Sequence, residues 1–116
     1  MMMHKDQLDG LLTGNTLYVD LPADAQGAGT CMLYHGADGR AALKLPAGQT
    51  LVGTWSLKAD HYVVDWVNGP KNGLWALERS DGKIALIEIA SGKSRGQVTK
   101  LVPGNAESLL RSIELP

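Results

Sequence analysis

Two histidines, His35 and His61, fall within predicted strands and are the first candidates for chemistry. His61 shares a strand face with Asp65, and an imidazole beside a carboxylate could hold a metal ion or exchange a proton. Residues four apart in a strand lie about 13 Å from each other, which is too far for one metal ion or one acid–base pair. We therefore expect both histidines to be surface or hydrogen-bonded residues, His4 to be exposed, and no metal to be bound.

The single cysteine and the six serines lack the surroundings of a nucleophile. Cys31 lies within a predicted strand without the Cys-His spacing of a thiol enzyme, and a thiol in such a position usually packs. The serines fall in turns or helix ends, outside any Gly-x-Ser-x-Gly elbow. Gly92-Lys93-Ser94 lacks the upstream glycine-rich stretch of a phosphate loop. The sequence therefore predicts a protein without catalytic residues or cofactors, not an enzyme.

Five aromatic side chains form the candidate ligand-binding site: Trp55, Trp66, Trp75, Tyr34 and Tyr62. The three tryptophans fall on three consecutive predicted strands. Indoles on neighbouring strands either fill the centre of a barrel or line a cavity for an apolar or planar ligand. Because the chain has no phenylalanine, tryptophan could also serve as its bulky filler.

Composition restricts the partners and the compartment. Eleven Lys and Arg against twelve Asp and Glu give a formal net charge of -1, so no excess positive field favours nucleic acid. One cysteine cannot form an intrachain disulfide, which allows a reducing compartment. Residues 1–12 lack the long apolar stretch of a secretory signal. We expect a cytoplasmic protein without a membrane span, or an exported one whose signal has been removed.

Short apolar runs separated by turn residues predict about eight strands in a single domain over residues 1–116. Gly53 lies in the middle of the apolar face made by Leu51, Trp55 and Leu57, which predicts a bend or a close backbone approach. Asp81-Gly82 between two β-prone runs predicts a two-residue hairpin with Gly82 at positive φ. The predicted strands are residues 16–22, 30–35, 40–45, 50–57, 61–67, 73–79, 83–90 and 97–102.

Apolar spacing predicts a short helix at each end of the chain. In residues 4–12, Leu8, Leu11 and Leu12 share one helical face, and Asn105 precedes a second apolar stripe over residues 106–113. Consecutive antiparallel strands of this size close most simply as a meandering barrel, with a flattened sandwich as the alternative. If such a barrel binds a ligand, we expect the N-terminal helix to cover its opening as a lid.

Five segments carry a family resemblance: Leu12–Tyr18, Tyr34–Arg40, Gly53–Leu57, Val64–Trp66 and Leu74–Trp75. Over roughly residues 12 to 90 they resemble small bacterial lipocalin-like β-barrel proteins of unknown function. The resemblance implies a mainly β, lipocalin-like barrel. Exported relatives of this pattern often carry a cysteine pair where this chain has Tyr62 or Val63 and Leu74, and the absence of that pair here fits a reduced compartment.

Two functions from different classes follow from the sequence. The first is a non-enzymatic barrel that binds a small apolar molecule within its interior. The alternative is a structural or protein-interaction module, in one form a homodimer, whose barrel core is solid and whose exposed strand faces or terminal helices make the contacts. An enclosed void bordered by Trp55, Trp66 or Trp75 would favour the first.

Overall fold

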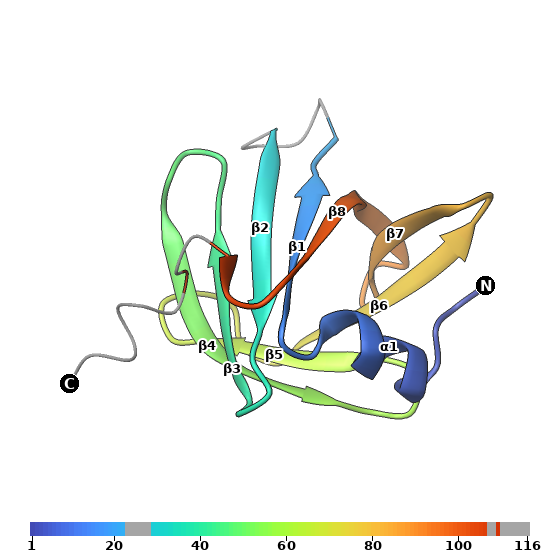
Figure 1. The fold of residues 1–116 in the computed structure, drawn as a ribbon, viewed down its shortest axis with the longest axis horizontal. Helices are drawn as coiled ribbons and strands as arrows, with labels where there is room; N and C mark the ends of the chain where they lie inside the picture. The colour runs from blue at the N-terminus through green and yellow to red at the C-terminus, as the bar shows by residue number, and fades with distance from the viewer. Residues whose placement is uncertain (23–28, 107–108, 110–116) are drawn as a thin grey trace.

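The computed structural model describes residues 1–22, 29–106 and 109. These residues form one helix and eight strands that run as an antiparallel meander (Figure 1). The elements are α1 (Lys5–Leu12), β1 (Asn15–Asp20), β2 (Thr30–His35), β3 (Arg40–Lys44), β4 (Thr50–Leu57), β5 (Tyr62–Trp66), β6 (Gly73–Ser80), β7 (Lys83–Glu88) and β8 (Lys93–Pro103). The predicted helix over residues 106–113 lies largely outside the described residues.

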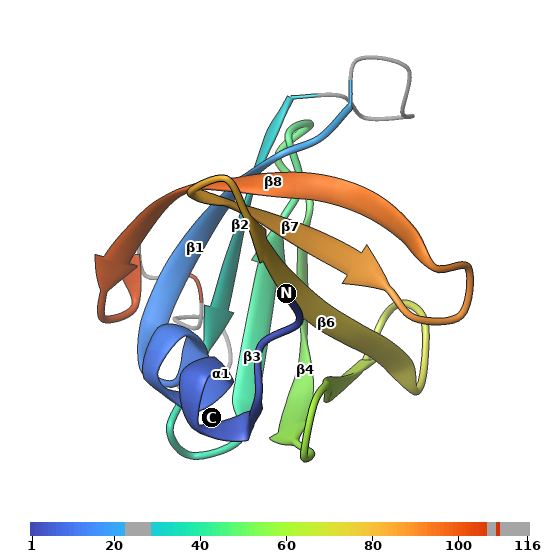
Figure 2. The same cartoon turned by 90° about the vertical axis from the view of Figure 1, so that its right-hand side faces the viewer.

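Each strand pairs with its neighbours in the sequence, and β8 pairs with β1 to close the barrel. The prediction of a mainly β chain with an eight-stranded meander closed as a small barrel is therefore confirmed. Figure 2 shows the strands crossing steeply around the interior. Closure pairs every strand with a neighbour on each side, although β5 and β6 pair over only three residues each, and it leaves little edge on which another chain could add a strand.

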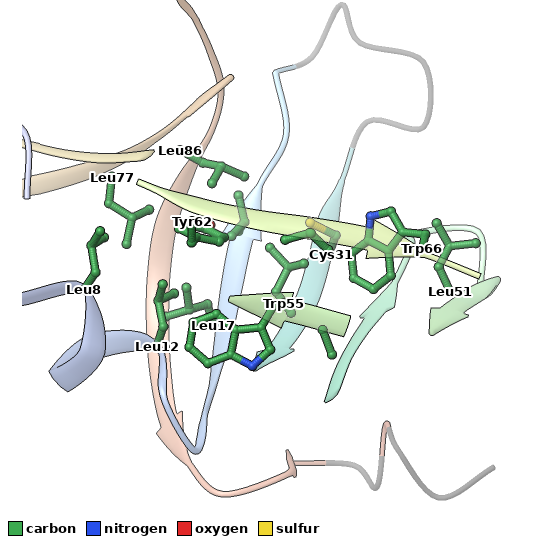
Figure 3. Packing of buried hydrophobic residues seen from close by; sticks show 14 of the residues in the cluster. Leu8, Leu12, Leu17, Cys31, Leu51, Trp55, Tyr62, Trp66, Leu77 and Leu86 are labelled. Atoms are coloured by element: carbon green, nitrogen blue, oxygen red, sulfur yellow. The ribbon is translucent and has the colours of Figure 1, made fainter. Parts of the chain in front are cut away.

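Buried and less buried side chains alternate along the strands, so that one set faces the interior and the other the outer surface. In β5 every second residue is buried, namely Tyr62, Val64 and Trp66. In β4 the buried residues are Leu51, Gly53 and Trp55, so the predicted apolar face is confirmed. Figure 3 shows these buried side chains running from Leu8 of helix α1 to Trp66 and Leu51 at the other side.

The turn at Asp81-Gly82 has the predicted conformation. Asp81 has φ 52° and Gly82 has φ 76°, and Ser80 pairs with Lys83 across the turn. Positive φ at both central residues is the type I′ geometry, whose twist matches that of the flanking strands.

Strand β8 begins at Lys93, four residues before the predicted start, so the prediction of a loop through Gly96 was wrong. Lys93 and Ser94 pair with Glu88 and Ile87, and the register shifts between Leu86 and Ile87 before the pairing continues. Such a β-bulge accommodates an extra residue without ending the strand. Residues 93–96 are polar or glycine, so they lack the apolar alternation that predicts a strand. Pairing with the neighbouring strand β7 nevertheless holds the segment in an extended conformation.

Helix α1 closes one end of the barrel and belongs to its core. Leu8 and Leu12 are fully buried, and the backbone N–H of Lys5 donates to the carbonyl of Ala59, 2.8 Å away. Figures 1 and 2 show the helix at the end where β1 begins. The helix is therefore a plug at this end of the barrel, and its action as a lid over a ligand stays a prediction.

Gly53 is required by the close approach of β4 and β5. A Cβ atom at this position would lie 1.9 Å from the carbonyl oxygen of Asp65. We expect Gly53→Ala to lower the free energy of unfolding by about 2 kcal/mol or more, because the two strands must move apart. Gly10→Ala is the control, since its Cβ would meet nothing within 4 Å and alanine favours a helix. Urea unfolding that ranks Gly53→Ala at or above wild type would contradict this account.

The burial of α1 predicts different losses of stability when Leu11 and Leu12 are replaced by alanine. Leu12 is fully buried, whereas Leu11 is half-buried beside the core. We expect Leu12→Ala to cost about 2–5 kcal/mol of stability and Leu11→Ala distinctly less. Equal, small losses for both variants in chemical denaturation would show that the helix only rests on the barrel.

Candidate functional site

An apolar cavity of about 140 Å³ lies inside the barrel. It is lined by the inward-facing residues of β2, β3, β5, β6 and β7, together with residues at the end of β1 and the start of β8. The lining residues are Leu21, Cys31, Leu33, His35, Leu43, Leu45, Tyr62, Val64, Trp66, Trp75, Leu86 and Arg95. None of them belongs to α1, so the helix and the cavity occupy different parts of the interior.

His35 and Tyr62 form the most deeply buried part of the lining. His35 is 0% exposed and Tyr62 is 1% exposed. Their ring centroids are 5.3 Å apart in an edge-to-face arrangement, and Trp55 meets His35 in the same manner at 5.0 Å. Edge-to-face contacts of this kind hold the rings in fixed orientations. His35 and Tyr62 therefore make a rigid floor for the cavity.

The imidazole of His35 is neutral and lacks hydrogen-bond partners. Neither ring nitrogen, Nδ1 nor Nε2, has a partner among the described residues. Burial lowers the pKa of His35 to about 3, since a charge is costly away from water. A neutral imidazole offers one N–H donor and one nitrogen lone pair, and both are unused by the described part of the protein.

The other titratable groups inside the barrel are also uncharged at neutral pH. Burial raises the pKa of the Cys31 thiol to about 11, and it also raises the pKa of Tyr62, with a smaller contribution from Cys31. A protonated, buried thiol is a poor nucleophile. The interior thus offers weak hydrogen-bonding groups within an apolar surface.

The cavity reaches the surface at Arg95, which is exposed, beside the half-buried Leu21 and Leu45. Arg95 is held by Glu88, whose Oε1 accepts from Nη2 at 2.7 Å and from Nε at 3.1 Å. The hydrogen bond from the Ser91 hydroxyl, together with this pairing, lowers the pKa of Glu88. The cation at the rim is therefore already bonded to a carboxylate.

A folded loop between β5 and β6 is bonded to the end of β5, where Trp66 lines the cavity. The Lys71 ammonium donates to the carbonyl of Trp66 and, at 3.3 Å, to that of Val67. The backbone N–H of Asn72 donates to the Asp65 carboxylate. Residues 67–72, which connect the two strands, thus hold the backbone beside one wall of the cavity.

The structure brings together three of the five aromatic residues selected from the sequence. Tyr62, Trp66 and Trp75 line the cavity. Trp55 packs behind His35, and its indole N–H donates to the carbonyl of Gly36 at 2.8 Å. Tyr34 faces the outer side of β2, where it packs against a cluster of Ala42 and Leu109.

The remaining histidines lie away from the cavity. His61 precedes β5 and its Nδ1 lies 2.8 Å from a carboxylate oxygen of Asp60. His4 is exposed, as expected, and its backbone N–H donates to the Gln7 side chain at the start of α1. Within residues 1–22, 29–106 and 109, no three His, Cys, Asp or Glu side chains gather where they could hold a metal ion.

Sequence reasoning missed His35, which it placed among surface or hydrogen-bonded histidines. That expectation is wrong, because the side chain is fully buried and unpartnered among the described residues. The alternation of side chains along residues 30–35 could have predicted the burial of His35. Cys31, Leu33 and His35 are spaced by two and therefore share the inner face of one strand.

Comparisons with protein-family models, curated proteins and solved structures found no match for this chain. In the described part of the chain, the one helix is far shorter than a bilayer-spanning segment.

The neutral state of His35 predicts how stability depends on pH. The unfolded chain takes up a proton at this imidazole below about pH 6.5, whereas the folded protein does so only near pH 3. The free energy of unfolding should therefore fall by roughly 1.4 kcal/mol per pH unit as the pH decreases within this window.

Comparison of wild type with His35→Leu isolates this contribution. The lowered pKa values of Asp38, Asp60 and Glu88 also reduce stability in acid, but these carboxylates are present in both proteins. We expect the variant to lose less stability than wild type between pH 6 and pH 4 in urea unfolding. Parallel curves for the two proteins would mean that His35 is not held neutral by burial.

Proposed function

We propose that this protein is a non-enzymatic binding protein that takes up one small apolar molecule inside its barrel. The observation that carries the proposal is the cavity of about 140 Å³ among apolar and aromatic side chains. Its size matches that of an engineered apolar cavity of about 150 Å³ that binds benzene. A ligand of one ring therefore suits the available space.

The chemistry of the lining supports binding without catalysis. His35, Cys31 and Tyr62 are uncharged at neutral pH because burial disfavours their charged forms. A general acid or base works best when its pKa lies near the working pH, and these groups are far from it. The same groups are well suited to contact an uncharged ligand.

The alternative, an interaction module with a solid core, has less support. Leu74 and Ile89 are exposed large apolar residues that lie side by side, since the Ile89 N–H donates to the Leu74 carbonyl at 3.0 Å. Two such side chains cover far less than the roughly 800 Å² per partner that a stable interface buries. Scattered exposed apolar residues are normal on soluble proteins. The membership of lipocalin-like barrel proteins suggested by the sequence also remains a proposal.

Titration with toluene, followed by NMR of the methyl groups, tests the proposal. We expect saturable shifts at Leu33, Leu43 and Val64, which line the cavity. We also expect toluene to raise the unfolding midpoint. At a free toluene concentration of 100 times the dissociation constant, the free energy of unfolding should increase by about 2.7 kcal/mol. Absence of binding by folded wild-type protein would contradict the proposal and favour the solid-core alternative.

A matched pair of variants places the ligand inside the barrel. Val64 lines the cavity, whereas its neighbour Val63 is the half-buried residue that alternates with it in β5. We expect Val64→Phe to weaken toluene binding at least tenfold because the larger ring occupies the cavity, and Val63→Phe to leave binding near wild type. If Val64→Phe does not fold, Leu43→Trp at the half-buried part of the lining replaces it. Equal affinity in all folded variants would place the toluene elsewhere.

A further inference from the structure

The floor of the cavity carries a polar group whose hydrogen-bonding capacity is unused within the described residues. His35 is fully buried, it lines the cavity, and neither of its ring nitrogens has a partner there. Its orientation is fixed by edge-to-face contacts with Trp55 and Tyr62. A buried polar group without a partner costs about 1–3 kcal/mol, and native proteins contain few of them.

Packing alone gives no reason for an imidazole at this position. The neighbours of His35 on the same face of β2 are Cys31 and Leu33, and the cavity lining beyond them is mostly leucine, valine and tryptophan. An apolar side chain of similar size would fill the site without the cost of an unpaired group. The imidazole therefore points to a partner that enters from the cavity.

We propose that the ligand is an uncharged one-ring aromatic alcohol, of the phenol class, whose hydroxyl hydrogen-bonds a ring nitrogen of His35. This inference rests on the proposed function, since it names the class of molecule that the same cavity takes. The aromatic ring of the ligand lies among Tyr62, Trp66, Trp75 and the leucines of the lining.

The hydroxyl group follows from the chemistry of a neutral imidazole. One ring nitrogen donates a hydrogen bond and the other accepts one, and which is which depends on the tautomer. A hydroxyl can both donate and accept, so it satisfies whichever nitrogen faces the cavity. A carbonyl or an ether oxygen could serve only the donor.

Absence of charge on the ligand follows from the surroundings. A carboxylate or an ammonium group would lose its hydration on entering an apolar cavity, and neutral His35 offers no compensating charge. Arg95 at the rim is the cation in the lining, and it is already bound by Glu88 through two hydrogen bonds. Benzoate and anilinium-like ions should therefore be excluded.

One ring follows from the volume and from the shape of the lining. The cavity of about 140 Å³ is close to the volume that holds benzene in an apolar site, so a hydroxyl adds about the largest substituent that fits. Aromatic side chains surround this space, and a planar ring can meet them face to edge.

The test compares phenol with toluene, which has the same number of heavy atoms and nearly the same shape. We would measure the affinity of both for wild type, for His35→Leu and for Tyr62→Phe. Tyr62 is the control because it carries the only oxygen among the lining side chains of the described residues. The quantity of interest is the ratio of phenol to toluene affinity, in which general changes of the cavity cancel.

We expect His35→Leu to lower the phenol-to-toluene ratio by about tenfold, the value of one neutral hydrogen bond of about 1.4 kcal/mol. Tyr62→Phe should retain the wild-type ratio. An unchanged ratio in His35→Leu would overturn the proposal, and loss of the ratio in Tyr62→Phe alone would transfer the role to Tyr62. Benzoate that binds as tightly as phenol would overturn the uncharged class. If wild type bound toluene but not phenol, the cavity would stand and this inference would fail.

A measurement on the unmodified protein covers the case in which His35→Leu does not fold. In protein with ¹⁵N-labelled histidine, phenol should shift the ring nitrogen signals of His35, whereas toluene should shift them little. His4 and His61 lie away from the cavity and serve as internal controls. Saturating phenol with no change at the His35 nitrogens would show that the hydroxyl binds elsewhere.

Discussion

Pairing of β1 with β8 is the constraint on which the rest of the barrel depends. The two strands pair over the whole of β1, with a register shift between Tyr18 and Val19. The Thr16 hydroxyl strengthens the junction because it donates to the carbonyl of Gly104 at 2.7 Å and accepts from the N–H of Ala106 at 3.0 Å. With only eight strands, the closed interior is narrow, and side chains fill all but a small part of it.

Strands β5 and β6 separate after a short paired stretch, and this separation divides the interior space. These strands pair only through Tyr62–Val64 and Gly73–Trp75, so the later part of β6 has no partner in β5. Residues 1–3 fill this position: the Met3 N–H donates to the Leu77 carbonyl and the Arg79 N–H donates to the Met1 carbonyl, both at 2.9 Å. The chain then enters α1, which completes the core at this end. The unfilled volume consequently lies toward the other end, near Arg95.

Local patterns in the sequence predicted the features that depend on neighbouring residues. The face of Leu51, Trp55 and Leu57, the close approach at Gly53 and the turn at Asp81-Gly82 each follow from two or three adjacent positions. The start of β8 did not follow, and neither did the contact of residues 1–3 with β6, because register shifts and the gap beside β6 arise only when distant strands meet. Trp66 and Trp75 were selected from the sequence for their residue type. Which indoles border the cavity depends on the same register between distant strands.

His35 shows why a buried polar residue can be missed by reasoning that seeks a stable fold. Reasoning from strand alternation and core packing predicts an apolar residue at each inward-facing position of β2. A polar residue at such a position, as His35 is, lowers stability. The cost has a consequence for selectivity. A site that holds an unpaired buried polar group discriminates strongly against a ligand that leaves the group unpaired, and favours one that satisfies it. In a cavity too small for many contacts, one such group contributes more to the choice of ligand than the surrounding apolar surface, which attracts all one-ring molecules alike.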